Sequence, residues 1–419
     1  MTQSFRVAVV ARSVYPLHRY GGLERHVYDL VRCLLERSVR VTLITPPAAP
    51  DRPADSRAEA LLRHPCLTVR PVPYATFPLA NRRGTTILDR STAYPLFGLR
   101  AGGLAARLVA AGEIDLVHGL GASVLGYAAA DRRSRTAPLI FNPQGLEEFG
   151  ATDPSRAPLK RLGYWPLRAA VRYCARRATC VIATDRSIVD PVRTHLRVPA
   201  DRIRVIPNAI EPGTCQPASE VSRASALRDR VGLREDDLLL LSVGRLEANK
   251  GFHVLVRALA RLADEGALPL HWRWVLVGDG PMRASLERRI TSAGLAEHAI
   301  LWGRADPADL HGWYEAATLF VHPTLYEGSS LVTLEAMAHS KAIVACRSGG
   351  LPDKVRSGVN GWLVVPGEPA ALSAAIREAI SSGPRLSEMG RASRRIVESE
   401  FSWEAVTDTL LELYAELLT

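Results

Sequence analysis

Short apolar runs alternate with stretches of helical hydrophobic spacing through the first half of the chain. Leu23, Val27, Leu30 and Leu34 follow the first run and predict a helix. Strands that alternate with helices are typical of a parallel, doubly wound sheet, which binds ligands at the carboxyl ends of its strands. The Pro- and Arg-rich tract 46–81 has weak periodicity and predicts irregular surface structure. The predicted strands are residues 5–10, 39–44, 114–117, 139–141, 180–182 and 203–206.

A second series of the same kind begins at residue 238. The preceding stretch is poor in large apolar residues and favours an interdomain linker. We therefore predict an α/β protein with two doubly wound domains, residues 1–210 and 236–400, joined by a linker at 211–235 and facing a central cleft. The spacing of residues 402–419 predicts a helix that packs back onto the first domain. The predicted strands of this half are residues 238–243, 274–277, 300–302, 319–321, 342–345 and 362–365.

Two carboxylates, Glu327 and Glu335, lie eight positions apart in a strand, loop and helix pattern. The pattern places Glu327 in the loop and Glu335 on the helix, which Gly328, Ser329 and Ser330 open. Unpaired N–H groups at a helix start favour a phosphate, and carboxylates accept hydrogen bonds from sugar hydroxyls. A nucleotide-sugar combines both groups. The alternative is that both acids are ordinary solvated surface residues.

Two cations, Arg245 and Lys250, follow the first strand of the second half in the sequence LSVGRLEANKG. A guanidinium fork and an ammonium group at the carboxyl end of a strand suit a diphosphate leaving group. Gly278, in VGDGP, marks another tight turn from strand to helix. Its GxG is a weak signal for a dinucleotide, and no glycine run is followed by a Walker GKS/T, so hydride and ATP chemistry are poorly supported.

The first half offers two candidate ligand contacts. Gly21 and Gly22 precede its first predicted helix, where adjacent glycines let the backbone approach a diphosphate or a sugar, although a simple turn explains them equally well. His118, in DLVHGLG, follows an apolar strand at the position where this fold class places reactive side chains. Bonding to a sugar hydroxyl, assistance in proton transfer and a purely structural role all fit this histidine.

Composition limits the classes of protein and partner. The chain has 419 residues, is 47% hydrophobic and carries a net charge of +10, which favours anionic partners without choosing among them. Its six cysteines are scattered without a CxxC pair, which argues against zinc or a disulfide framework and favours the reducing cytoplasm. No apolar run approaches the ~18 residues that span a bilayer, and the chain begins without a signal-peptide pattern.

A basic stripe on a predicted helix suggests a peripheral contact with the inner face of a membrane. Arg168, Arg172 and Arg176 lie four positions apart, just after Tyr164 and Trp165. Such a helix could lie on anionic lipid. An ordinary solvated helix face is the alternative.

Taken in order, the motifs resemble the retaining glycosyltransferases of family 4, whose GT-B fold pairs two Rossmann-like doubly wound parallel-sheet domains. The resemblance covers nearly the whole chain and is far more specific than any one motif. Four positions depart from the usual pattern: the Ser329-Ser330 pair, Gln144, Ala209 and Asp353. The motifs are GGLERHVYDL, VHGLG, VIPNA, SVGRLEANKG, VGDGP, the Glu327 and Glu335 block with EAMA, GGLPD and NGWLV.

The resemblance implies a role for each site residue. Arg245 and Lys250 would neutralise the donor diphosphate, which would be that of UDP or GDP. Glu335 would bind the ribose hydroxyls and Glu327 those of the transferred sugar, which His118 would contact from the first domain. The remaining implied donor-binding residues are Gly21, Gly22, Gly278, Gly328, Ser329, Ser330 and Leu331. The possible acceptor contacts are Gln144 and Glu147.

The implied reaction is glycosyl transfer from a nucleotide-diphosphate-sugar to an acceptor hydroxyl, with retention of the anomeric configuration. The acceptor would be a glycan, a lipid-linked sugar or a small molecule, and no nucleic-acid partner is expected. Members of this fold commonly need no metal, so we expect neither a metal nor another cofactor. Two alternatives stay open: a sugar-nucleotide epimerase on the same fold, and a non-catalytic protein that binds nucleotide-sugars.

Overall fold

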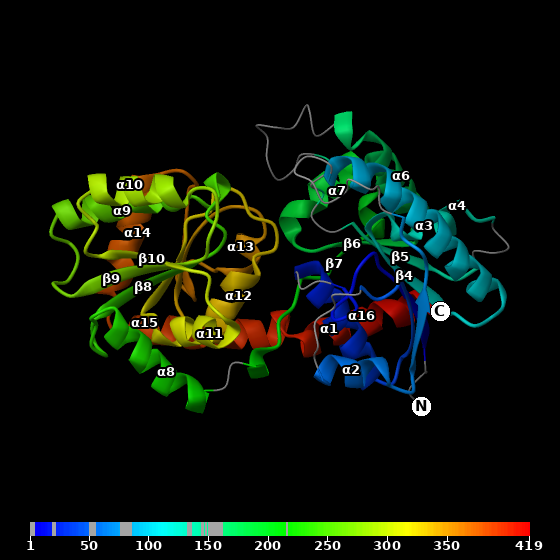
Figure 1. The fold of residues 1–419 in the computed structure, drawn as a ribbon, viewed down its shortest axis with the longest axis horizontal. Helices are drawn as coiled ribbons and strands as arrows, with labels where there is room; N and C mark the ends of the chain where they lie inside the picture. The colour runs from blue at the N-terminus through cyan, green and yellow to red at the C-terminus, as the bar shows by residue number, and fades with distance from the viewer. Residues whose placement is uncertain are drawn as a thin grey trace. The chain divides into compact units, whose positions relative to one another are not determined.

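The structure is a computed structural model that describes residues 5–18, 22–49, 56–75, 86–131, 136–143, 146, 149, 162–214 and 217–419. The chain forms two compact units (Figure 1). Unit 1 comprises Met1–Asn208 and Trp403–Thr419, and unit 2 comprises Ala209–Ser402. Each unit is built on one parallel sheet with helices on both faces, which confirms the predicted α/β class.

Unit 1 contains a seven-stranded parallel sheet. Its strands are β1 (Arg6–Val10), β2 (Arg40–Thr45), β3 (Leu67–Pro71), β4 (Leu116–Leu120), β5 (Leu139–Asn142), β6 (Cys180–Ala183) and β7 (Ile203–Val205). The strand order is β3-β2-β1-β4-β5-β6-β7. The edge strand β3 lies in the tract predicted to be irregular, so that prediction is wrong. Its side chains are half-buried or exposed, as on many sheet edges, and they leave little hydrophobic signal in the sequence.

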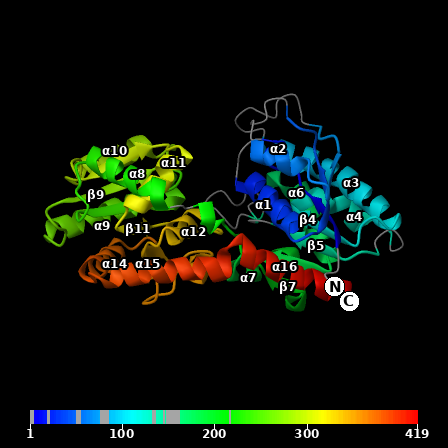
Figure 2. The same cartoon turned by 90° about the horizontal axis from the view of Figure 1, so that it is seen from below.

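The helices of unit 1 cover opposite faces of this sheet (Figure 2). They are α1 (Gly22–Glu36), α2 (Ser56–Leu62), α3 (Thr86–Ala110), α4 (Leu125–Ala129), α6 (Trp165–Arg177), α7 (Val189–Leu196) and α16 (Trp403–Leu418). Ala8 and Val10 of β1 share a core with α3, α4, α6 and α7. On the other face, the C-terminal helix α16 packs against α1. Leu410 and Tyr414 of α16 are buried there.

Unit 2 contains a six-stranded parallel sheet. Its strands are β8 (Leu238–Val243), β9 (Trp272–Val277), β10 (Ala299–Gly303), β11 (Leu319–His322), β12 (Ile343–Cys346) and β13 (Gly361–Val364). In the strand order β10-β9-β8-β11-β12-β13, β8 and β11 are the two central strands and their carboxyl ends lie side by side. Its helices are α8 (Pro217–Arg230), α9 (Phe252–Asp264), α10 (Arg283–Ser292), α11 (Pro307–Ala316), α12 (Leu331–Ala338), α13 (Leu351–Lys354), α14 (Pro369–Ser381) and α15 (Arg385–Ile396).

The segment 211–235, predicted to be a linker, largely belongs to unit 2. Its helix α8 packs on α11, and Leu227 and Val231 enter the core of that unit. Arg223 also forms an ion pair with Asp309 of α11, at 2.7 Å. The linker prediction is therefore wrong over α8. Its apolar stripe is narrow and lies between charged residues, so average composition conceals it.

The predicted basic stripe on α6 is also only partly right. Arg172 turns inward, where its Nε donates to the carbonyl of His195 at 2.8 Å. Arg168 and Arg172 both lie over the ring of Phe149, at 5.1 and 5.6 Å from its centroid. Arg176 alone of the three is exposed. Two of the three arginines therefore belong to the packing of α6 rather than to one outward stripe.

Candidate functional site

The predicted carboxylate block forms the expected strand, loop and helix in unit 2. Strand β11 ends at His322, the loop carries Glu327, and α12 begins at Leu331 and carries Glu335. Ser330 is the N-cap of α12, where its Oγ accepts from the backbone N–H of Thr333. The side chain of Ser330 is buried, so its hydroxyl serves as a helix cap and is turned away from solvent, whereas the prediction made it a donor contact.

Glu327 is bound by two donors from different elements. Lys250, in the short helix Ala248–Lys250 after β8, places Nζ 2.7 Å from Oε2 of Glu327. His322 places Nε2 2.8 Å from the same oxygen. Side-chain exposure is 12% for Glu327, 18% for Lys250 and 0% for His322. The fold thus assembles a nearly buried cluster at the carboxyl ends of β8 and β11.

This environment keeps Glu327 ionised. Burial alone would raise the pKa of its carboxyl group, but the hydrogen bonds and charges of His322 and Lys250 lower that pKa to about 2. Both hydrogen bonds reach Oε2. The second oxygen, Oε1, takes part in neither bond and keeps its capacity to accept from a ligand hydroxyl.

His322 was not predicted from the sequence as a site residue. Within the described part of the chain, its Nδ1 is buried and has no hydrogen-bond partner. Nε2 is therefore the ring nitrogen that donates to Glu327, and Nδ1 takes no part in the cluster. The available signal was position: His322 ends an apolar strand five residues before Glu327.

Arg245 and Glu335, two further predicted site residues of unit 2, are bonded to other side chains. The side chain of Arg245 is 74% exposed and pairs with Glu247 at 3.1 Å, so the structure brings Lys250 to Glu327 but does not bring Arg245 there. Glu335 is held in place by the buried Tyr314, whose hydroxyl donates to Oε2 at 2.7 Å. Their contacts with a donor stay predictions.

Two loops of unit 2 approach neighbouring backbone so closely that one position in each requires glycine. A Cβ at Gly349, where φ is 52°, would lie 1.7 Å from the carbonyl oxygen of Glu327. A Cβ at Gly278, where φ is 143°, would lie 1.9 Å from that of Gly244. Gly349 thus packs directly on the loop that carries Glu327. Gly278 has a structural reason to be glycine whether or not it binds a donor.

The start of α12 contains the remaining predicted donor contacts. Gly328 has open space where a Cβ would lie. Ser329 accepts a hydrogen bond from the buried Lys354, at 3.3 Å between Nζ and Oγ. Leu331 is the first residue of the helix and is half-buried. The hydroxyl of Ser329 is therefore already bonded to the protein, and backbone N–H groups remain as the predicted phosphate donors.

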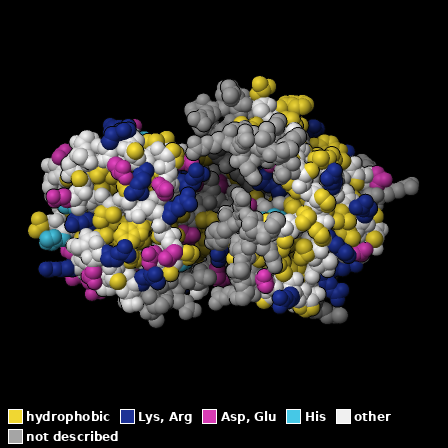
Figure 3. Space-filling view, viewed as in Figure 1, with side chains coloured by type: hydrophobic (Ala, Val, Ile, Leu, Met, Phe, Trp, Pro, Cys, Tyr) yellow, Lys and Arg dark blue, Asp and Glu magenta, His cyan; other side chains and the backbone are white. Residues whose placement is uncertain are grey.

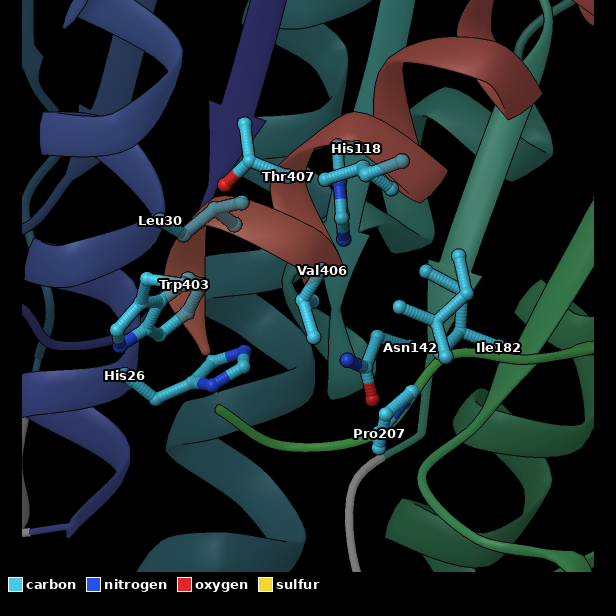
Figure 4. Close-up of a pocket in the computed structure, with 11 residues that line it drawn as sticks. His26, Leu30, His118, Asn142, Ile182, Pro207, Trp403, Val406 and Thr407 are labelled. Atoms are coloured by element: carbon cyan, nitrogen blue, oxygen red, sulfur yellow. The ribbon is translucent and has the colours of Figure 1, made fainter. Parts of the chain in front are cut away.

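In unit 1, His118 lies in the middle of β4 rather than at its end. It is 2% exposed, and its Nδ1 lies 2.7 Å from the hydroxyl of Tyr414 on α16. Figure 4 shows His118 and His26 beside one cavity, which Asn142, Trp403 and other side chains also line. Burial, together with the nearby His26, lowers the pKa of His118 to about 3, so it is neutral at physiological pH. Its predicted contact with a sugar stays a prediction.

Gly22 is the first residue of α1, and a Cβ there would meet nothing within 4 Å. Gly21, Gln144 and Glu147 lie outside the described residues. Among the residues that are described, no three His, Cys, Asp or Glu side chains are grouped to hold a metal ion. The expectation that the reaction needs no metal stays a prediction.

Two family models match successive parts of the chain. Residues 20–213 match Glycosyltransferase Family 4, and residues 224–396 match Glycosyl transferases group 1. The alpha-maltose-1-phosphate synthase of Mycolicibacterium smegmatis is 29% identical, over 98% of this chain and 99% of its own length. The D-inositol 3-phosphate glycosyltransferase 1 of Catenulispora acidiphila is 28% identical, over 98% and 95%.

Solved structures agree with the sequence relatives. The sucrose-phosphate synthase of Thermosynechococcus elongatus superposes with a TM-score of 0.73 at 22% identity and covers 99% of both chains. The Anabaena protein HepE, crystallised with UDP, superposes with a TM-score of 0.69 at 20% identity, over 98% of this chain and 100% of its own. These structures show that the fold is GT-B. The two family models and the sequence relatives show that the class is that of the glycosyltransferases. The chain belongs to glycosyltransferase family 4, group 1.

Proposed function

We propose that the protein transfers a sugar from a nucleotide-diphosphate-sugar to an acceptor hydroxyl with retention of the anomeric configuration. The observation that carries the proposal is the cluster of Glu327, Lys250 and His322, which combines a buried carboxylate with an ammonium group at the carboxyl ends of two central strands. HepE, which has this fold, was crystallised with UDP and with UDP-glucose. That observation supports a nucleotide-sugar donor.

The site residues fit separate parts of such a donor. Lys250 and the exposed Arg245 supply positive charge to the diphosphate, and the backbone N–H groups at the start of α12 add a partial charge. Glu327 binds hydroxyls of the transferred sugar through its free oxygen, and Glu335 binds the ribose diol. The two carboxylates thus hold the sugar and the ribose, on either side of the diphosphate that the cations neutralise.

In this reaction the bond between the anomeric carbon and the diphosphate oxygen breaks, and negative charge develops on the departing diphosphate. The acceptor oxygen forms its bond on the same face of the sugar, and its proton passes to the phosphate oxygen that leaves. No redox step or further co-reactant is needed. Preplaced charges such as Lys250 stabilise the developing negative charge and lower the barrier.

The first prediction tests this donor site with two variants, Lys250→Ala and Glu327→Gln. Incubation with a panel of UDP- and GDP-sugars, with inositol 3-phosphate among the acceptors, should release nucleoside diphosphate, and NMR should show a retained anomer. Each substitution should lower kcat/KM by roughly tenfold to a thousandfold, the effect of removing one electrostatic stabiliser. Arg63→Ala, at an exposed surface position, should change nothing.

Two outcomes would contradict the proposal in different ways. If both variants release nucleoside diphosphate at the rate of the unmodified protein, the site is misassigned. If the donor sugar changes configuration without any acceptor, the protein is an epimerase. NMR of the recovered sugar distinguishes these results.

A further inference from the structure

The outward faces of α3 and α6 combine exposed apolar side chains with arginines. On α6 and just before it, Trp165 is 67% exposed and Leu162 is 81% exposed. In Figure 3, apolar side chains gather over the region that Figure 1 labels α3 and α6. The exposed large apolar residues of this region are Leu96, Leu99, Leu162, Trp165 and Tyr173.

The two helices are neighbours, so these residues belong to one side of unit 1. Helix α3 packs on α6. The hydroxyl of Ser91 donates to the carbonyl of Gly163 at 2.7 Å, which brings the starts of the two helices together. Trp165, Ala169 and Tyr173 are exposed at four-residue spacing along α6, and the exposed Arg176 lies on the same face of the helix. The outward stripe of α6 is therefore apolar and aromatic, with basic residues at its end.

Apart from one acid, the charged side chains of α3 and α6 are all arginines. The acid of the two helices is Asp89, which accepts from the hydroxyl of Tyr74 at 3.2 Å. Arg177 lies over the ring of Tyr173, 5.5 Å from its centroid, and keeps its charge at the surface. A second copy of this face would meet it with the same charge, which disfavours a dimer here. The arginines of the two helices are Arg90, Arg100, Arg107, Arg168, Arg172, Arg176 and Arg177.

We propose that this side of unit 1 docks on an anionic bilayer surface, with Leu162 and Trp165 in the interface and Arg176 and Arg177 against lipid headgroups. Tryptophan and tyrosine favour the boundary between water and hydrocarbon, and arginine gains from the negative surface potential. Among the described helices, none is long and apolar enough to cross a membrane. The contact is therefore peripheral and acts through surface side chains.

Vesicle flotation of the full chain tests the proposal. Phosphatidylcholine vesicles with phosphatidylglycerol should carry the protein at low salt, and phosphatidylcholine vesicles alone should carry much less. The double variant Arg176→Ala, Arg177→Ala should weaken binding by about fivefold for each arginine removed. Trp165→Ala should weaken it as well. Arg63→Ala and Leu270→Ala, at exposed positions outside these two helices, are the matched controls and should bind as the unmodified protein does.

Three results would overturn the proposal. The first is equal flotation with both kinds of vesicle at low salt, and the second is unchanged binding by the arginine and Trp165 variants. The third is that the protein sediments as a dimer, that Trp165→Ala sediments as a monomer and that neither binds vesicles. This face would then be the interface with a second copy of the chain. Circular dichroism and release of nucleoside diphosphate from a soluble donor verify that each variant is folded.

Discussion

At the residue scale, the site depends on the carboxylate of Glu327, which accepts hydrogen bonds from both Lys250 and His322. Glu327 is nearly buried, and burial alone would raise the pKa of its carboxyl group. Lys250, in the short helix after β8, and His322, at the end of β11, reverse that effect. The function of Glu327 therefore depends on His322, which need not contact a donor to matter. Its role is to position Glu327 and to keep it charged.

Replacement of His322 tests this role. His322→Leu removes one hydrogen bond to a charged group, and we expect a loss of about tenfold to a hundredfold in kcat/KM. The pKa of Glu327 should rise from about 2, so the acid limb of the pH profile should move to higher pH. His322→Gln, which can still donate, should recover part of the loss. His298→Leu, a histidine that lies before β10, is the control.

An acid limb that stays in place in His322→Leu would contradict the role of His322 as a positioning residue. A loss of thermal stability without that shift would show that His322 only packs. The comparison of the Leu and Gln variants separates the hydrogen bond from the volume of the ring.

At the element scale, α8 decides where unit 2 begins. Its sequence is charged and contains few large apolar residues, so it resembles a linker. In the structure, Leu227 is 2% exposed and joins the core between α8 and α11. A single well-placed apolar residue per turn is enough to attach a helix to a domain. The helix is then part of the fold rather than a tether.

Leu227→Ala therefore tests the assignment of α8. Loss of a buried leucine side chain should destabilise unit 2 by about 2–5 kcal/mol, whereas the same change in a linker would have almost no effect. Thermal melts monitored by circular dichroism, with hydrogen exchange to locate the change in unit 2, provide the measurement. Leu270→Ala, at a leucine that is 85% exposed, is the matched control. If both variants were equally stable, α8 would be part of the linker and not of the core of unit 2.

At the scale of the whole molecule, the chain returns to unit 1 after completing unit 2. Helix α16 packs on α1 and places Tyr414 against His118. Arg37 and Arg204 add ion pairs to α16 through Asp408 and Glu416, at 2.7 and 2.9 Å. Helix α16 thus completes the core of the first unit, covers His118 and packs Trp403 against the ring of the half-buried His26.

Those two histidines predict acid sensitivity. Burial lowers the pKa of His26 to about 4, and burial with the charge of His26 lowers that of His118 to about 3, against 6.5 in the unfolded chain. Between these values the unfolded state binds more protons, so stability is complete above about pH 6.5 and falls as pH decreases towards 4. The expected slope is about 1.4 kcal/mol per pH unit for each histidine.

Melting temperature measured from neutral pH to pH 4 checks this behaviour. His118→Met should melt lower at neutral pH, because Tyr414 loses its partner, but its melting temperature should depend less on pH. The same substitution at the exposed His271 should leave the slope unchanged. A slope in His118→Met equal to that of the unmodified protein would show that the acid sensitivity has another origin.

The sequence by itself determined the class of fold and the ordered motifs of the family. Most strands of both sheets appear as short apolar runs, because a strand buried on both faces must be apolar throughout. The same reason explains the failures at β3 and α8, where one face is exposed and the apolar signal is weak. Glu327 and Lys250 were predicted as site residues because they follow apolar strands, whose carboxyl ends bind ligands in this class of fold.

Only the tertiary structure decided which of those groups meet. Residues 250, 322 and 327 lie at or just after the ends of two strands that are far apart in sequence, and parallel pairing of β8 with β11 brings them within hydrogen-bond distance. The tertiary structure also leaves Arg245 exposed, makes Ser330 a helix cap and encloses His118 beneath α16. Local patterns specify which elements form, but burial and side-chain direction depend on neighbours that are distant along the chain.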